Sequence, residues 1–257
     1  MVPGFHHPGG RRAMVSIHIH QFAPEGTLVD EHAMVQFQKQ WTAYQKLVDS
    51  DVLAHRAAGA VLRAALMDET EPFSFLDIAC GDASLARRAL EGTKVAHYHG
   101  IDLAEPAIEL AARMLDGVPY EVDLDHADFV ASLRDRPEPF DIAWCGLSLH
   151  HLVTADKLTL LREIHDTTSD FLMLYEPARH DGEDRDAFVR RFLAAQEPLW
   201  TTLTLEEIGQ IEHHIRTCDL PETVSGWLDL GREAGFSSAK TVFADPTDGL
   251  VMFRYDV

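Results

Sequence analysis

The sequence predicts an α/β fold in which a doubly wound, mostly parallel sheet of seven strands is covered by helices on both faces. Two observations lead to this prediction. First, five short apolar segments alternate with segments of helical periodicity from residue 73 to residue 175, and such a repeat indicates a parallel sheet. Second, two apolar segments joined by a short turn end the chain, and we expect this hairpin to pair antiparallel.

The predicted elements follow from hydrophobic periodicity along the chain. We expect strands at residues 73–79, 96–101, 118–122, 140–146, 170–175, 239–244 and 250–255. We expect helices at residues 82–91, 104–115, 125–133, 155–166 and 222–234. Because the connections between parallel strands are right-handed, the carboxyl ends of the first five strands should form one ligand-binding crevice.

The segments outside this core carry two further predictions. Breaker residues without a sustained period indicate a flexible N-terminus, and the helical pattern that follows it should form lid helices, with Trp41 and Tyr44 near the ligand. A second helical stretch, with Thr204 and Glu207 in a capping-box pattern, interrupts the βα rhythm. The predicted organisation is a flexible segment (1–27), lid helices (28–68), a core (69–182), a helical cap insertion (183–220) and the end of the core (221–257).

Composition limits the classes of partner. With 22 basic and 42 acidic side chains the formal charge is −20, which repels nucleic acids and anionic membranes and favours a small-molecule substrate. No apolar run is long enough to span a bilayer. The 3 widely spaced cysteines suit reduced thiols, so we expect a cytoplasmic protein. The oligomeric state is left open.

The first strand and the turn after it carry the most specific signal. Residues Phe75-Leu-Asp-Ile-Ala-Cys-Gly-Asp-Ala-Ser84 read as an apolar strand that runs into a tight turn of small residues. Gly81 leaves room for a ligand to approach the backbone, and Asp102, at the end of the second strand, can accept hydrogen bonds from both hydroxyls of a ribose. This combination predicts a nucleoside-binding unit.

The order of strands, the terminal hairpin and these motifs resemble the class I S-adenosylmethionine-dependent methyltransferases over residues 70–257. The resemblance implies a Rossmann-like fold and S-adenosylmethionine as the cofactor. In that family the first strand leads into an acid and three spaced glycines, and here Asp77, Ala79, Cys80, Gly81 and Ala83 stand there, so only the central glycine is kept. We expect alanine to be tolerated at the two flanking places if its φ stays below zero.

The resemblance also assigns further cofactor contacts. It implies that Asp102, with Leu103, holds the ribose, and that Asp123, with Leu124, holds the adenine amine, while Asp125 and Asp128 are nearby competitors for the latter role. It implies that backbone carbonyls around Cys145 and Gly146 accept from the ammonium group of the cofactor. The fourth strand and the turn after it, Phe140-Asp-Ile-Ala-Trp-Cys-Gly-Leu-Ser-Leu-His-His-Leu152, carry this part of the likeness.

Candidate catalytic residues follow the fourth and fifth strands. His150 and His151 come directly after strand four, where an imidazole can accept a proton near neutral pH or orient backbone groups. Glu176, at the end of strand five, is expected to face the same crevice and to bind an amine or hydroxyl of the substrate.

We expect no metal site. His213 and His214 are adjacent in a helical segment and should diverge by about 100°. The four histidines near the N-terminus have no acid or cysteine to complete a set of ligands.

The sequence therefore predicts a methyltransferase that modifies a small-molecule metabolite by in-line transfer. Two alternatives remain open: a regulatory or partner protein that binds S-adenosylmethionine without turnover, and an NAD-dependent dehydrogenase. The dehydrogenase fingerprint fails at Ser84, where the third glycine needed for close helix packing would stand.

Overall fold

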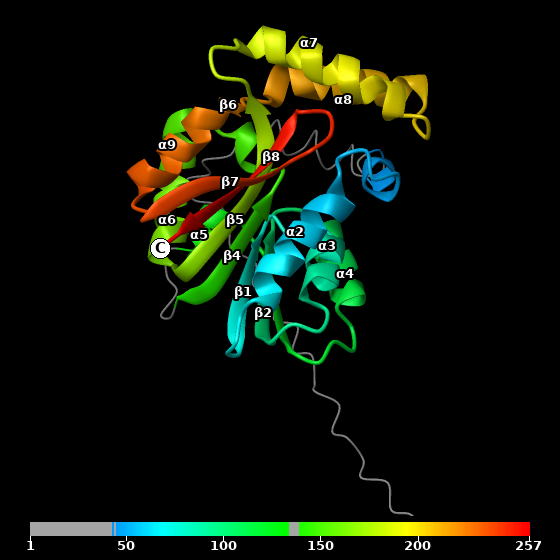
Figure 1. Cartoon of the computed structure of the whole chain (residues 1–257). Helices are drawn as coiled ribbons and strands as arrows, with labels where there is room; N and C mark the ends of the chain where they lie inside the picture. The colour runs from blue at the N-terminus through cyan, green and yellow to red at the C-terminus, as the bar shows by residue number, and fades with distance from the viewer. Residues whose placement is uncertain (1–42, 44, 134–138) are drawn as a thin grey trace, which may run out of the picture.

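The computed structural model describes residues 43, 45–133 and 139–257, and it has the predicted α/β fold (Figure 1). The strands are β1 (Phe73–Ile78), β2 (Val95–Asp102), β3 (Glu121–His126), β4 (Phe140–Gly146), β5 (Thr168–Arg179), β6 (Glu222–Thr223), β7 (Ser238–Ala244) and β8 (Leu250–Asp256). They form one sheet in the order β3-β2-β1-β4-β5-β8-β7, with the two-residue β6 paired to β5. The first five strands are parallel, and β8 is antiparallel to both β5 and β7, as predicted.

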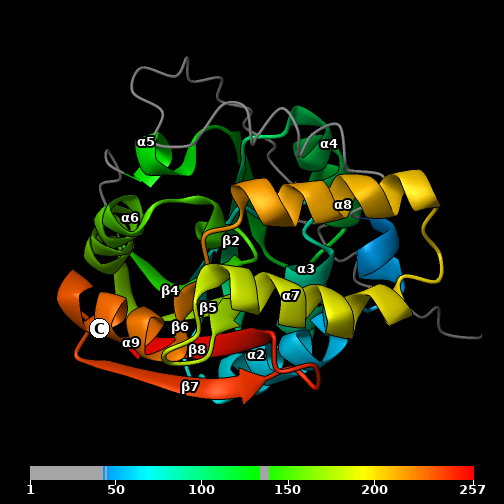
Figure 2. The ribbon, with the colours of Figure 1, turned by 90° about the horizontal axis from the view of Figure 1, so that it is seen from above.

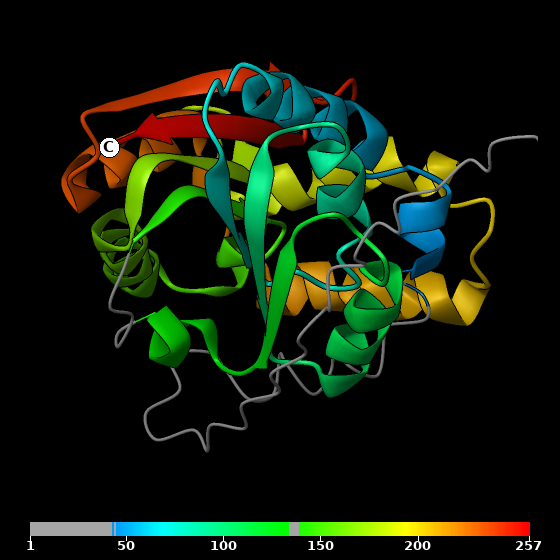
Figure 3. The same ribbon diagram turned by 90° about the horizontal axis from the view of Figure 1, so that it is seen from below.

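Helices cover both faces of the sheet, which Figure 3 shows from below. The helices that belong to these layers are α2 (His55–Met67), α3 (Ser84–Leu90), α4 (Glu105–Met114), α5 (Phe129–Leu133), α6 (Thr154–Asp166) and α9 (Val224–Ala234). The first three pack in one layer and the last three in the other, so each face of the sheet has its own apolar cluster. A fully buried parallel sheet needs this double cover.

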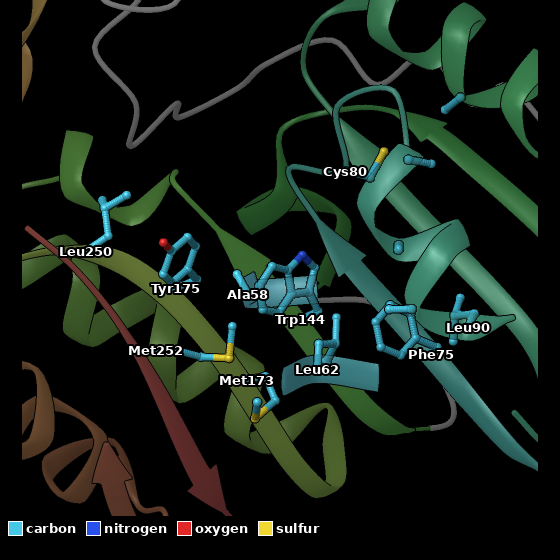
Figure 4. Packing of buried hydrophobic residues seen from close by; sticks show 14 of the residues in the cluster. Ala58, Leu62, Phe75, Cys80, Leu90, Trp144, Met173, Tyr175, Leu250 and Met252 are labelled. Atoms are coloured by element: carbon cyan, nitrogen blue, oxygen red, sulfur yellow. The ribbon is translucent and has the colours of Figure 1, made fainter. Parts of the chain in front are cut away.

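The core beneath α2 shows why that helix forms and where it lies. Ala58, Leu62 and Leu66 recur at helical spacing and are fully buried. All three belong to one apolar cluster, in which Ala58 and Leu62 lie near Trp144 of β4 and Met173 of β5 (Figure 4). Burying a leucine side chain contributes about 1.5–3 kcal/mol, so this stripe fixes α2 on the sheet.

The position of β3 differs from the prediction. We expected a strand at residues 118–122, but β3 begins at Glu121 and ends at His126. Its polar residues are accommodated by the neighbouring strand, since Asp123 pairs with His97 at 2.8 Å and Asp125 pairs with His99 at 3.0 Å. These cross-strand pairs let a strongly polar segment occupy the edge of the sheet.

Two helices lie above the carboxyl edge of the parallel strands. They are α7 (Arg185–Gln196) and α8 (Leu205–Cys218), which run side by side across the top of the sheet in Figure 2, joined by a segment that contains the short helix η2 (Glu197–Leu199). Thr204 and Glu207 form the capping box that the sequence predicted at the start of α8. In the part of the chain that the structure describes, none of the helices has the length and apolarity of a membrane span.

Candidate functional site

A cavity of about 390 Å³ opens at the carboxyl ends of β1 and β4, and we call it the large cavity. Its volume falls in the range of about 300–1,000 Å³ typical of small-molecule and cofactor sites. Five of the predicted cofactor-binding residues line it: Asp77, Ala79, Cys80, Gly81 and Gly146. The turn after β1 is therefore part of a cavity wall, as the sequence predicted.

The backbone of this turn corrects one expectation. Ala79 and Ala83 adopt left-handed conformations, with φ of 56° and 58°, as does Gly81 at 56°. We expected alanine to be tolerated at these places if its φ stayed below zero, and neither alanine meets that condition. The turn has the shape that three glycines would give it, and each left-handed alanine costs roughly 1–2 kcal/mol because its Cβ approaches the following carbonyl oxygen.

Asp77, the last residue but one of β1, lines the large cavity. Its Oδ2 accepts a hydrogen bond of 2.7 Å from the buried hydroxyl of Tyr98. Burial raises the pKa of Asp77 to about 7, and the hydrogen bond from Tyr98 opposes that rise. A carboxyl group with this pKa changes charge near neutral pH, so the charge next to the cavity depends on pH.

Asp102 ends β2 beside the same turn. One carboxylate oxygen accepts from the backbone N–H of Gly81 at 2.8 Å, and the other accepts from Ala104 N–H at 2.8 Å. Burial raises the pKa of Asp102, and these two backbone donors oppose the rise. Since a carboxylate offers about four lone-pair positions, Asp102 retains acceptor capacity after holding the turn.

Asp102 and four other predicted cofactor residues do not line either cavity described here. Asp123 lies within β3, bonded to His97, because the strand begins later than expected. Leu124 and Cys145 are fully buried. Leu103 accepts at its backbone oxygen from Nε2 of His126 at 3.0 Å. The first acid after β3 is Asp128, two residues beyond its end, and it is buried.

The residues before α2 also line the large cavity. Residues 45–49 are helical, and Gln45, Val48 and Asp49 contribute to the wall. Lys46 on this helix pairs with Glu207 of α8 at 2.5 Å, which links the helix to the segment above the sheet. Trp41 and Tyr44, which we predicted near the ligand, lie outside the described residues.

A second cavity of about 110 Å³, which we call the small cavity, lies between the sheet and the helices above it. Its walls are largely apolar, with Trp200 and Phe192 from the segment above the sheet and Ile211 and Ile215 from α8. Leu147, directly after β4, lines both cavities. The two cavities therefore adjoin each other at this residue.

Both predicted catalytic histidines line the small cavity. They lie in the short helix η1 (Leu149–His151) after β4, with ring centroids 4.0 Å apart. Burial lowers the pKa of His150 and of His151 well below the usual value, so both rings are neutral at pH 7.

Glu176 does not contact either cavity. Its side chain is fully buried, and its oxygens accept from the backbone N–H groups of Ser148 (3.0 Å), Leu149 (2.8 Å) and His150 (3.3 Å) and from Nδ1 of His150 at 2.6 Å. Burial raises its pKa to about 7. The structure does not support the predicted substrate contact, because these bonds use Glu176 to hold the turn that carries the histidines.

Comparison with known proteins gives these observations a family context. Residues 75–170 match the family described as methyltransferase domain. This segment, about a third of the chain, is similar to that domain and includes most of β1 and all of β2 to β4. A search of curated proteins found no match.

Several solved structures share the fold of this chain. Magnesium protoporphyrin IX methyltransferase from Synechocystis PCC 6803, solved with SAH, is 13% identical with a TM-score of 0.57, and the alignment covers 88% of this chain and 94% of that one. A plantazolicin methyltransferase, solved with a substrate analogue and SAH, is 12% identical with a TM-score of 0.62 over 88% and 94%. A putative O-methyltransferase from Nostoc punctiforme PCC 73102 is 18% identical with a TM-score of 0.57 over 91% and 63%. At this level of identity the likeness shows the class I methyltransferase fold.

The structure also places two residues at the candidate site that the sequence did not reveal. Asp219 and His214 line the small cavity beside His150 and His151. His214 comes from α8, and Asp219 directly follows that helix. The one signal in the sequence was the adjacent pair His213-His214, whose side chains we expected to diverge. His213 is exposed, while His214 lines the small cavity.

Proposed function

We propose that the chain is an S-adenosylmethionine-dependent methyltransferase that modifies a small-molecule metabolite. The observation that carries this proposal is the pair of cavities on either side of Leu147 at the carboxyl edge of the sheet. One is large enough for a nucleoside cofactor and the other suits a compact, partly apolar acceptor. Methyl transfer requires two ligands that meet at one point, and this arrangement supports such a meeting.

The large cavity is the proposed site of S-adenosylmethionine. Gly81 and Ala79 give the close turn against the cofactor, and the remaining acceptor capacity of Asp102 serves the ribose hydroxyls. We assign the adenine amine to Asp128 rather than to Asp123, because Asp128 lies two residues after the carboxyl end of β3, whereas Asp123 is held by His97 within the strand. Gly146 remains the proposed contact of the ammonium group.

The small cavity is the proposed acceptor site. In the transfer, an electron pair of the acceptor forms a bond to the methyl carbon while the carbon–sulfur bond breaks and its electrons return to sulfur, which leaves S-adenosylhomocysteine. Alignment of the three atoms supplies much of the rate, within the limit of ~7–11 kcal/mol for well-oriented reactions. The apolar walls from Trp200 and Phe192 exclude water from the acceptor atom.

Two further features support the predicted cellular location and class of acceptor. The 3 cysteines are free, which agrees with a reducing, cytoplasmic location. The formal charge of −20 favours a small-molecule acceptor over nucleic acid.

Binding calorimetry with S-adenosylmethionine, S-adenosylhomocysteine and NAD tests the cofactor. Asp102→Ala should weaken binding of both sulfur nucleotides by about 1–3 kcal/mol, or roughly 5- to 150-fold, through loss of hydrogen bonds to a buried carboxylate. Asp116→Ala is the matched control, since Asp116 is exposed in the turn after α4. Binding of NAD without a response to either sulfur nucleotide would refute the proposal and favour the dehydrogenase.

Turnover separates the enzyme from a regulator. The chain is incubated with methyl-labelled S-adenosylmethionine and a metabolite extract, and labelled small molecules are sought. We expect a labelled product that depends on the intact Asp102. Binding of the cofactor without any transfer of label would favour the regulatory alternative.

A further inference from the structure

The small cavity contains a cluster of nitrogen and oxygen atoms around one carboxylate oxygen. Asp219 Oδ1 lies 3.8 Å from His150 Nε2, 3.6 Å from His151 Nδ1 and 3.4 Å from His214 Nε2. All four side chains are at most 14% exposed. The cluster joins η1 after β4, the inner face of α8 and the residue that follows α8.

These contacts are not hydrogen bonds. Asp219 Oδ1 and His151 Nδ1 are buried, and among the residues that the structure describes neither has a hydrogen-bond partner. Leaving such atoms unsatisfied costs about 1–3 kcal/mol each. The cluster is therefore incomplete without a further species that interacts with several of these atoms at once.

The spacing identifies that species. Ligand atoms that bind a tetrahedral Zn²⁺ at about 2.1 Å lie about 3.4 Å from one another. The three distances to Asp219 Oδ1 are close to this value and too long for strong hydrogen bonds. Ligand atoms of His150, His151 and Asp219 all lie within 4.8 Å of one another, so one ion fits between them.

A carboxylate holds the other ring nitrogen of His150, as is usual for a histidine that binds a metal. Nδ1 of His150 bonds to Glu176 Oε2 at 2.6 Å, and Glu176 is itself fixed by backbone N–H groups of the same turn. With the proton on Nδ1, the lone pair of Nε2 points toward Asp219. Such a carboxylate behind a histidine orients the ring and raises its affinity for a metal.

We propose that the small cavity holds a divalent transition-metal ion of the Zn²⁺ type, bound by His150 Nε2, His151 Nδ1 and Asp219 Oδ1, with His214 beside the fourth position. Imidazole nitrogens select Zn²⁺ over Mg²⁺, which prefers oxygen ligands. Two histidines and one carboxylate leave a position open for water or substrate. The further role, in which the ion binds and orients an oxygen or nitrogen atom of the acceptor, rests on the proposed function.

Adjacent histidines reach one ion here because they use different nitrogens. His151 presents Nδ1, near its backbone, and His150 presents Nε2, at the far end of its ring. Our argument that adjacent histidines diverge holds for His213 and His214, of which only His214 faces the cavity. The sequence-based expectation of no metal site is revised accordingly.

Zinc binding is tested on the full chain, in a background where His6, His7, His18 and His20 are replaced by glutamine to remove adventitious binding near the N-terminus. The protein is treated with chelator, dialysed and titrated with Zn²⁺ in a calorimeter, and its metal content is measured by mass spectrometry. We expect one Zn²⁺ per chain and much weaker binding of Mg²⁺. The visible spectrum of the Co²⁺ form should show four-coordinate geometry.

Substitutions test whether the Zn²⁺ ion binds at this cluster. Asp219→Asn and His151→Gln should each weaken Zn²⁺ binding at least about tenfold, whereas His213→Gln, on the exposed side of the same helix, should leave it unchanged. Circular dichroism identifies any variant that does not fold, and the other variant then decides. Absence of stoichiometric Zn²⁺, or its retention in both variants, would overturn the site.

This test is independent of the cofactor. If Zn²⁺ binds as expected but S-adenosylmethionine does not, the metal site stands and the proposed function fails. If the sulfur nucleotides bind and Zn²⁺ does not, the proposed function stands and the metal site fails.

Discussion

Ala79→Gly should stabilise the protein, although glycine usually destabilises. Ala79 has φ of 56°, a conformation that costs an alanine roughly 1–2 kcal/mol and costs a glycine almost nothing. The additional freedom of glycine in the unfolded chain offsets about 0.4–1 kcal/mol of that gain. The free energy of unfolding should therefore rise by about 0.5–1 kcal/mol.

Urea unfolding of the apoprotein, followed by circular dichroism, measures this difference. Ala60→Gly is the matched control, because Ala60 is exposed within α2, where the same substitution should lower the free energy of unfolding by about 0.5–1 kcal/mol. Ala83→Gly should be nearly neutral, since the relief of its left-handed backbone is balanced by loss of a buried methyl group worth about 0.8 kcal/mol. If Ala79→Gly destabilises as much as Ala60→Gly, the left-handed turn is wrong.

Three further predictions concern charge, the buried turn and the cap of α8. The pKa of Asp77 is raised from 3.8 to about 7, so between these pH values the folded state keeps a proton that the unfolded state has lost, and the free energy of unfolding falls as pH rises. In urea unfolding, Asp77→Asn should remove up to about 1.4 kcal/mol per pH unit of that dependence. An unchanged dependence on pH would contradict the raised pKa. Glu176→Ala should cost on the order of 3 kcal/mol in thermal unfolding, because it leaves buried donors of the η1 turn without an acceptor, and a loss below about 1 kcal/mol would argue against that role. Thr204→Ala should cost about 1 kcal/mol by the same measurement, with Thr201→Ala, exposed outside the helix, as the control.

The limits of sequence-based prediction are clearest at β3. Strand β4 was predicted with its exact bounds because most of its residues are apolar, with Asp141 as the one charged residue in the strand. In β3, acids alternate with apolar residues, and Asp123 and Asp125 were interpreted as the end of the strand and the region beyond it. They lie within the strand because His97 and His99 on β2 pair with them, and a single sequence does not reveal such partners across strands.

The candidate site was also predicted only in part from the sequence. The turn after β1 and the histidines after β4 are short local motifs, and the structure brings both to cavities at the carboxyl edge. The cluster in the small cavity joins residues from elements far apart in the sequence, so no spacing rule identifies it. The charge of Glu176 suggested a contact with the substrate. Its side chain is instead buried, and both of its carboxylate oxygens accept hydrogen bonds from the η1 turn.

The left-handed residues gather around one place in the molecule. Of the six non-glycine residues with positive φ in the described ranges, Asp51, Ala79 and Leu147 line the large cavity, and Ala54 and Ala83 adjoin residues that do. The surrounding fold imposes these conformations before any ligand arrives, so the cavity is preorganised. A ligand that enters it loses little binding free energy to ordering the wall, and its affinity should depend mainly on the contacts that it makes.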